Sequence, residues 1–146
     1  MWSRLQEEAV RREEPELLDL LPKLLEWQRW LLIHALELLP GPEQVFRFRI
    51  ILLLVARQNG KTVILIYLIL WRLFNDGAKL IIGTAQTVDI AEEAWETVVA
   101  VAEAIPELEQ EIAQRRGVTR RAGKFALALE SRERYKLAAA SRKGGR

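Results

Sequence analysis

The spacing of apolar residues predicts helices in the first part of the chain. Leucines and prolines that follow a charged opening stretch predict a short, interrupted helix, so residues 1–23 are interpreted as an N-terminal helical appendage. From Leu24 to Leu39, apolar positions recur every three or four residues, which predicts one helix with a buried face. That predicted face comprises Trp27, Trp30, Leu31, His34, Ala35 and Leu38. We interpret His34 there as a hydrogen-bonded core histidine rather than a catalytic one.

Three uninterrupted apolar segments follow. Ile50–Val55 predicts a central strand buried on both faces of a sheet. Val63–Trp71 fits a strand or a helix by pattern alone. Its place after a glycine-containing turn favours a helix, because strand, turn and helix together direct backbone amides at a phosphate. Ala78–Gly83 predicts a second buried, parallel strand.

The remaining pattern predicts two helices and a hairpin. Thr87 or Asp89 can cap a helix that continues to Pro106, and a shorter helix is expected over Glu107–Arg115. Beyond Gly117 the apolar residues alternate on both sides of a turn at 131–134, which predicts a β-hairpin. The alternating positions are Phe125, Leu127 and Leu129, then Tyr135, Leu137 and Ala139.

Composition narrows the chemistry. The 146 residues include no cysteine and one histidine, which excludes disulfides, thiolate metal sites and multi-histidine metal sites. The amino terminus carries acids where a signal peptide is apolar, and the longest apolar run is far shorter than a membrane span. We therefore expect a cytoplasmic protein without a membrane partner.

Charge is divided unevenly along the chain. Residues 1–114 contain 11 Lys and Arg against 18 Asp and Glu, whereas residues 115–146 contain 11 against 2. The basic segment can neutralise nucleic-acid phosphates, or it can be a solvated hairpin, and both interpretations stay open.

A candidate phosphate-binding loop lies between the first predicted strand and the following helix. Its residues are Arg57, Gln58, Asn59, Gly60, Lys61 and Thr62. Gly60 lets the backbone approach a phosphate, and Lys61 supplies a positive charge for it. The Thr62 hydroxyl can ligate Mg²⁺, and Arg57 adds a second cation. The usual G-x-x-x-x-G-K-[ST] pattern has glycine where this chain has Val55.

A loop of this form without the leading glycine resembles that of the large terminase subunits of tailed phages. Three further segments are similar to that family, in the same order along residues 24–146. They are Trp27–Trp30, where the family has a glutamine that contacts adenine; Gly83–Gln86 with Ala91 and Trp95; and Ala138–Arg146, similar to the stretch before the Walker B strand. The resemblance implies a P-loop NTPase-type α/β fold, with a parallel sheet flanked by helices and residues 24–146 as a partial ATPase domain.

The resemblance also implies cofactors and partners. ATP would be bound by residues 57–62 and Gln28, with Mg²⁺ at Thr62. Partners would be double-stranded DNA, a terminase small subunit and the portal of a procapsid, in the host cytoplasm. The chain has no apolar strand ending in Asp-Glu and stops at Arg146, where the Walker B strand would begin. We therefore expect nucleotide binding with undetectable or very slow hydrolysis, and exposed sheet edges that favour self-association.

Two other functions stay open. A small P-loop kinase would use the same loop, although the sequence has no acceptor-site carboxylate to support it. A non-catalytic nucleic-acid-binding or assembly module would instead use the basic segment 115–146.

Overall fold

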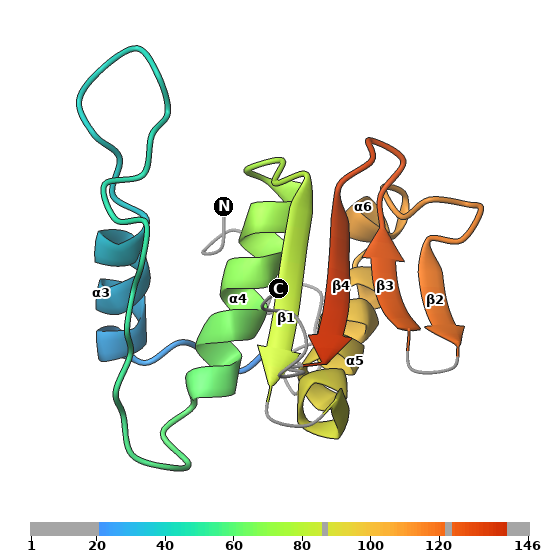
Figure 1. Cartoon of the computed structure of the whole chain (residues 1–146), viewed down its shortest axis with the longest axis horizontal. Coiled ribbons are helices and arrows are strands. Elements are labelled where there is room, and N and C mark those ends of the chain that lie inside the picture. Colours follow the sequence, from blue (N-terminus) through green and yellow to red (C-terminus); the bar gives the residue numbers. More distant parts are fainter. Residues whose placement is uncertain (1–20, 86–87, 122–123, 140–146) are drawn as a thin grey trace, which may run out of the picture.

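A computed structural model describes residues 21–85, 88–121 and 124–139 of the chain. These residues form a mixed α/β fold with a four-stranded sheet (Figure 1). The elements are α3 (Glu26–Ala35), α4 (Lys61–Phe74), β1 (Leu80–Ala85), α5 (Val88–Ala104), α6 (Pro106–Glu109), β2 (Val118–Arg121), β3 (Lys124–Ala128) and β4 (Arg134–Ala139). No helix among the described residues has the length and apolar character needed to cross a bilayer.

The strands lie in the order β1-β4-β3-β2, and only β1 and β4 are parallel. The predicted hairpin is confirmed, since β3 pairs antiparallel with β4 across the 131–134 turn. β2 extends it as a third antiparallel strand. The predicted second strand is also present as β1, but Leu80 and Ile82 remain 50% and 58% exposed. The prediction of a parallel strand is confirmed by the pairing with β4, whereas the prediction that the strand is buried is wrong for the face that carries Leu80 and Ile82.

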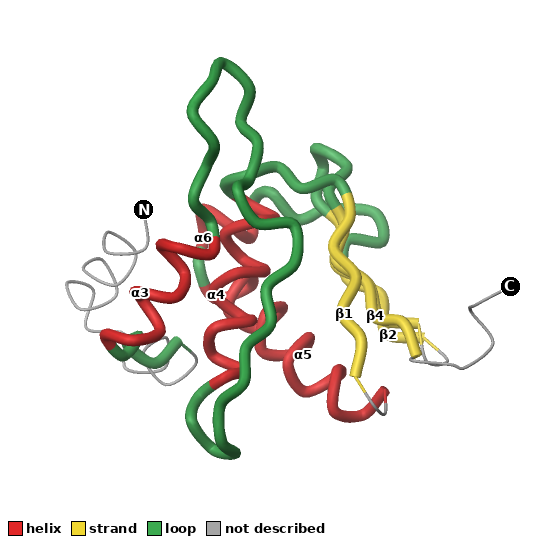
Figure 2. The backbone as a smooth tube through the Cα atoms, turned by 60° about the vertical axis from the view of Figure 1, so that its left-hand side comes forward, coloured by secondary structure: helices red, strands yellow, loops and turns green. Residues whose placement is uncertain are grey.

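The described helices lie on one side of the sheet and leave its other face open (Figure 2). The core forms where α4 and α5 meet each other and the covered sheet face, and its largest fully buried side chains are Trp95, Tyr67 and Tyr135. The helical interpretation of residues 63–71 is confirmed, because they lie within α4.

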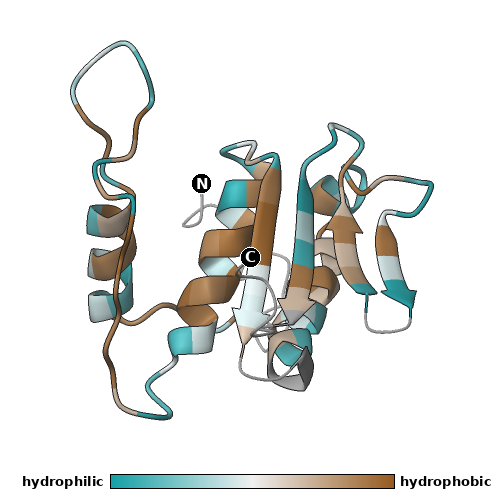
Figure 3. Ribbon diagram, in the orientation of Figure 1, coloured by the Kyte–Doolittle hydropathy of each residue, from teal (hydrophilic) through white to brown (hydrophobic). Residues whose placement is uncertain are grey.

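The largest departure from the sequence prediction is Ile50–Val55, which is an extended segment outside the sheet rather than a central strand. Ile50, Leu52 and Leu54 are 88%, 80% and 84% exposed. Figure 3 shows this apolar stretch running beside α3 and down to the loop before α4. A strand is stabilised only by neighbours that complete its hydrogen bonds, and no described strand pairs with this segment.

The predicted buried face of the first helix is confirmed only in part, because Trp27, Leu31 and Ala35 are half-buried whereas Trp30, His34 and Leu38 are exposed. Trp30 is 63% exposed, and His34 is an exposed residue whose ring lies 4.4 Å from the Trp30 ring, centroid to centroid. The buried residue of α3 is Gln28. No described element covers the Trp30 side of the helix, so helical spacing alone did not identify which face is buried.

The helix predicted over Glu107–Arg115 is a short α6 that ends at Glu109. Ile112 forms an antiparallel bridge with Leu129, and the Ala113 amide donates to the Ala128 carbonyl. The segment around Ile112 and Ala113 therefore pairs with the hairpin and does not continue as a helix. The N-terminal appendage up to residue 20, Gln86, the Thr87 cap and most of the 138–146 segment lie outside the described residues.

Candidate functional site

The turn that leads into α4 contains two residues with a left-handed backbone. Gln58 has a φ of 63°. Gly60, the N-cap of α4, has φ 71° and ψ 27°. Asn59, between them, keeps a negative φ. Alternating backbone handedness turns successive N–H groups toward one side, which makes a concavity that binds anions. The loop that the sequence singled out therefore has the backbone form of an anion site.

The amino terminus of α4 is open to an anion. Gly60 offers no side-chain cap, and the first turn contains no acidic residue. The first N–H groups of a helix lack intrahelical acceptors, and the helix dipole places partial positive charge there. Thr62, in this first turn, is exposed, so its hydroxyl is accessible. The helix thus adds donors beside the concavity of the loop.

Lys61 folds back over the loop. Its Nζ donates to the carbonyl oxygens of Val55, at 2.9 Å, and Ala56, at 2.7 Å. Lys61 forms no ion pair with any described residue. The ammonium is therefore held by neutral acceptors alone. A phosphate could replace them with a charged acceptor, which gives a stronger hydrogen bond.

Gln28 connects α3 to this loop. It is only 3% exposed. Its Oε1 accepts from the Leu25 amide at 2.8 Å, and its Nε2 donates to the Gly60 carbonyl at 3.1 Å. A Cβ at position 60 would lie 2.6 Å from that Nε2, so a larger residue would displace the end of the Gln28 side chain and would also be strained at this φ.

The position of Gln28 brings two distant candidate residues together. Gln28 is buried although its neighbours on both sides along α3 are less so. Each polar atom of its amide makes one hydrogen bond within the chain, so an adenine contact would have to use the second N–H or the second lone pair of a side chain that is almost fully buried. The adenine role stays a prediction. No sequence pattern predicts the contact with Gly60, since the two residues are 32 positions apart.

The other candidate residues lie at the surface. Arg57, Gln58 and Asn59 are exposed and form no side-chain hydrogen bond with a described residue. Among described residues, His, Asp and Glu side chains do not gather in groups of three that would hold a metal. A Mg²⁺ ion at this loop would therefore have the Thr62 hydroxyl and nucleotide phosphates as its ligands.

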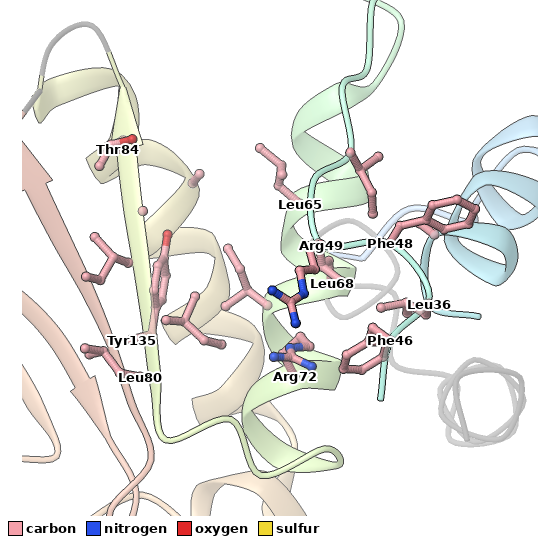
Figure 4. A pocket seen from close by; sticks show the side chains of 18 of the residues that line it. Leu36, Phe46, Phe48, Arg49, Leu65, Leu68, Arg72, Leu80, Thr84 and Tyr135 are labelled. Carbon is pink, nitrogen blue, oxygen red and sulfur yellow. The ribbon is translucent and has the colours of Figure 1, made fainter. Parts of the chain in front are cut away.

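An apolar groove of about 930 Å³ separates the extended segment from β1 (Figure 4). Leu65 and Leu68 of α4 line it, and Thr62 and Thr84 lie on its wall. Tyr135 also contributes to the lining, and burial raises the pKa of its phenol to about 12. The groove has no counterpart in the sequence prediction, because that prediction placed Ile50–Val55 inside the sheet.

Comparisons with protein families, with curated proteins and with solved structures found no significant match to this chain. Function is therefore inferred from the geometry of the loop and from the sequence resemblance of its residues.

Proposed function

We propose that residues 57–62 bind the phosphates of ATP together with Mg²⁺, and that the chain is the ATP-binding portion of a DNA-packaging motor of the terminase large-subunit kind. The observation that carries the proposal is the left-handed pair Gln58 and Gly60 at the start of α4, with Lys61 folded over it. Backbone donors, a helix terminus and an unpaired cation converge there, which is the combination that phosphate groups require.

Binding would proceed by exchange of acceptors. The Lys61 ammonium leaves the Val55 and Ala56 carbonyls for phosphate oxygens, while the exposed Thr62 hydroxyl joins the shell of the phosphate-bound Mg²⁺. Gln28 fixes the Gly60 carbonyl, which keeps the loop in its concave form before ligand arrives.

The proposal covers nucleotide binding rather than turnover. Activation of water beside the γ-phosphate needs a positioned carboxylate, and no Asp-Glu pair follows an apolar strand in this sequence. In a complete motor, hydrolysis would drive double-stranded DNA into a procapsid through the portal, with the small subunit as a partner.

A Lys61→Ala substitution tests the nucleotide site. We expect Mg²⁺-dependent binding of a fluorescent ATP analogue, measured by anisotropy, to weaken at least ~10-fold, because the charge-assisted contact to phosphate is lost. Lys79→Ala is the matched control, because Lys79 is an exposed lysine that lies outside the loop, just before β1. The Lys79→Ala variant should bind the analogue as the parent does. Equal binding by the Lys61 variant and the parent would refute the proposal.

One observation favours nucleic-acid binding as a second candidate function. Arg121, Lys124, Arg134 and Lys136 share the open face of the sheet, because Arg121 pairs with Lys124 and the β4 residues alternate with the buried Tyr135. On β3 the neighbours of Arg134 and Lys136 are small, at Ala128 and Ala126, whereas on β1 they are Leu80 and Ile82. None of the four forms an ion pair with a described residue. Phosphates of a nucleic acid can therefore reach these cations.

Among the described residues, the open face of the sheet carries cationic side chains but no aromatic ring. Tyr135 and Phe125 alternate onto the covered side, so bases of a single strand would find no ring to stack on. This favours contact with the phosphates of a duplex, which is independent of sequence.

Arg120 and Arg121 provide a matched pair for this second function. Arg120 lies on the covered side, bound to Glu96 at 2.9 Å and stacked on Trp95, whereas Arg121 is exposed on the open side. Arg121→Gln should weaken duplex binding and lower the salt dependence of log K by about 1, while Arg120→Gln should not. Equal effects, or binding that requires ATP, would count against a separate nucleic-acid function.

A further inference from the structure

The segment 48–56, which we call the strap, is anchored at its two ends. Just before it, the ring of Phe46 lies 6.3 Å from the ring of Trp71 in α4, centroid to centroid. Residues 48–54 form no hydrogen bond with another described residue. At the far end, the Lys61 side chain donates to the carbonyl oxygens of the last two strap residues. Lys61 is therefore the polar clamp that holds this end of the strap to α4.

The clamp leaves one donor of Lys61 free. An ammonium group has three N–H donors, and two of them serve the Val55 carbonyl, at 2.9 Å, and the Ala56 carbonyl, at 2.7 Å. In a phosphate-binding loop, the lysine reaches oxygens of both the β- and the γ-phosphate. These two oxygens and the two carbonyls would compete for three donors. ATP must therefore displace at least one carbonyl, whereas ADP, without a γ-phosphate, needs only the free donor.

The carbonyls are the acceptors that give way. A phosphate oxygen is charged, and a charge-assisted hydrogen bond is stronger than one to a neutral carbonyl. Lys61 forms no ion pair with a described residue that would oppose the exchange. Its bond to Ala56 is exposed, whereas its bond to Val55 is partly buried. Water can replace the ammonium at an exposed carbonyl, so the bond to Ala56 is the one whose loss costs least.

We propose that Lys61 makes the strap sensitive to the γ-phosphate, so that ATP loosens the clamp and ADP leaves it closed. The proposal rests on nucleotide binding at residues 57–62. Its consequence reaches the apolar groove, because Phe48, Arg49 and Ile51 of the strap line that groove (Figure 4). The state of the nucleotide is thereby transmitted from the loop to one wall of the groove.

The clamp can be tested without a ligand. The chain has no cysteine, so nitroxide labels at Leu52→Cys and Glu93→Cys, both at exposed positions, report the distance between the strap and α5 by double electron–electron resonance. In this background, Lys61→Met should widen the distance distribution at least ~2-fold, because methionine keeps an unbranched apolar stem but cannot donate to the carbonyls. Lys79→Met, outside the loop, should leave the width unchanged, and circular dichroism would show that both variants are folded. Equal widths for the Lys61 variant and the labelled parent would overturn the proposal.

Nucleotides then test the response of the clamp. With saturating Mg²⁺ and an ATP analogue that cannot be hydrolysed, the doubly labelled parent should show the wide distribution of the Lys61→Met variant, whereas ADP should leave the distribution narrow. Anisotropy of a fluorescent analogue, and its displacement by ADP, would establish that each nucleotide is bound. Bound ATP analogue without widening, or equal widening with ADP, would overturn the proposal while leaving the nucleotide site intact. Absence of nucleotide binding would refute the proposed function and this response together.

Discussion

Two aliphatic runs flank the candidate loop, and their surroundings are opposite. Ile50–Val55 precedes the loop and is largely exposed, whereas the run that follows, within α4, buries Ile64, Ile66 and Leu70. The two segments are nearly alike in residue type. Aliphatic character alone therefore does not determine which run enters the core.

The difference lies in how each backbone is satisfied. A helix completes its hydrogen bonds internally, so α4 needs only a surface to pack against, and α5 and the sheet provide one. A strand leaves its donors and acceptors to its neighbours. The first run has no such neighbour among the described residues, and it stays outside the sheet.

The largest effect that separates the two runs is expected from matched leucine truncations. Leu70→Ala removes a side chain with 0% exposure and should lower the free energy of unfolding by about 2–5 kcal/mol, because it leaves a cavity. Leu52→Ala, at 80% exposure, should change it by less than about 0.5 kcal/mol. Urea unfolding at low protein concentration would measure both. Similar losses would mean that the first run is buried in solution.

Alkaline pH should weaken the packed region through Tyr135. Burial raises the pKa of this phenol from 10.0 to about 12, so between these values the unfolded chain releases the proton while the folded chain retains it. Stability should be unaffected below pH 10 and should then fall as pH rises, by at most about 1.4 kcal/mol per pH unit. Tyr135→Phe should lose less stability than the parent between pH 9 and 11 in urea unfolding. Parallel losses would contradict burial of the hydroxyl.

A smaller effect is expected at the junction of the two runs. In Gly60→Ala the new Cβ lies at a left-handed φ of 71° and 2.6 Å from the Gln28 amide. In Gly77→Ala the φ is similar, at 68°, and the Cβ makes only an ordinary contact of 3.9 Å with Glu133. We expect about 1 kcal/mol for the backbone strain in each variant. Gly60→Ala should lose about 1 kcal/mol more, for the hydrogen bond from Gln28. Equal thermal stability of the two variants would indicate that Gln28 does not hold the loop.

The sequence predicted well the elements whose stabilising contacts are local. The helix after the loop, the helix that α5 represents and the hairpin of β3 and β4 were all foreseen. The candidate loop lies where the pattern placed it, directly before α4. The left-handed backbone at Gly60 is predictable, because glycine adopts positive φ readily. The positive φ at Gln58 is not indicated by any feature of the sequence.

The failures share a physical cause. The exposure of His34, the burial of Gln28 and the isolation of Ile50–Val55 all depend on which segment lies against which. Apolar periodicity identifies an apolar face of an element, but it does not indicate which other element packs against that face. The early end of α6 has the same cause, since Ile112 forms a β-bridge with Leu129 of the hairpin instead of continuing the helix.

Local features of the sequence specify the helices, the hairpin and a glycine-lysine-threonine turn at a helix start, because propensity, turn chemistry and local hydrogen bonds act over a few residues. The bond from Gln28 to the Gly60 carbonyl and the shared open face of the basic residues of β2 to β4 depend instead on the tertiary structure. These contacts join segments far apart in the chain, and their energy depends on burial and strand pairing that no local pattern encodes.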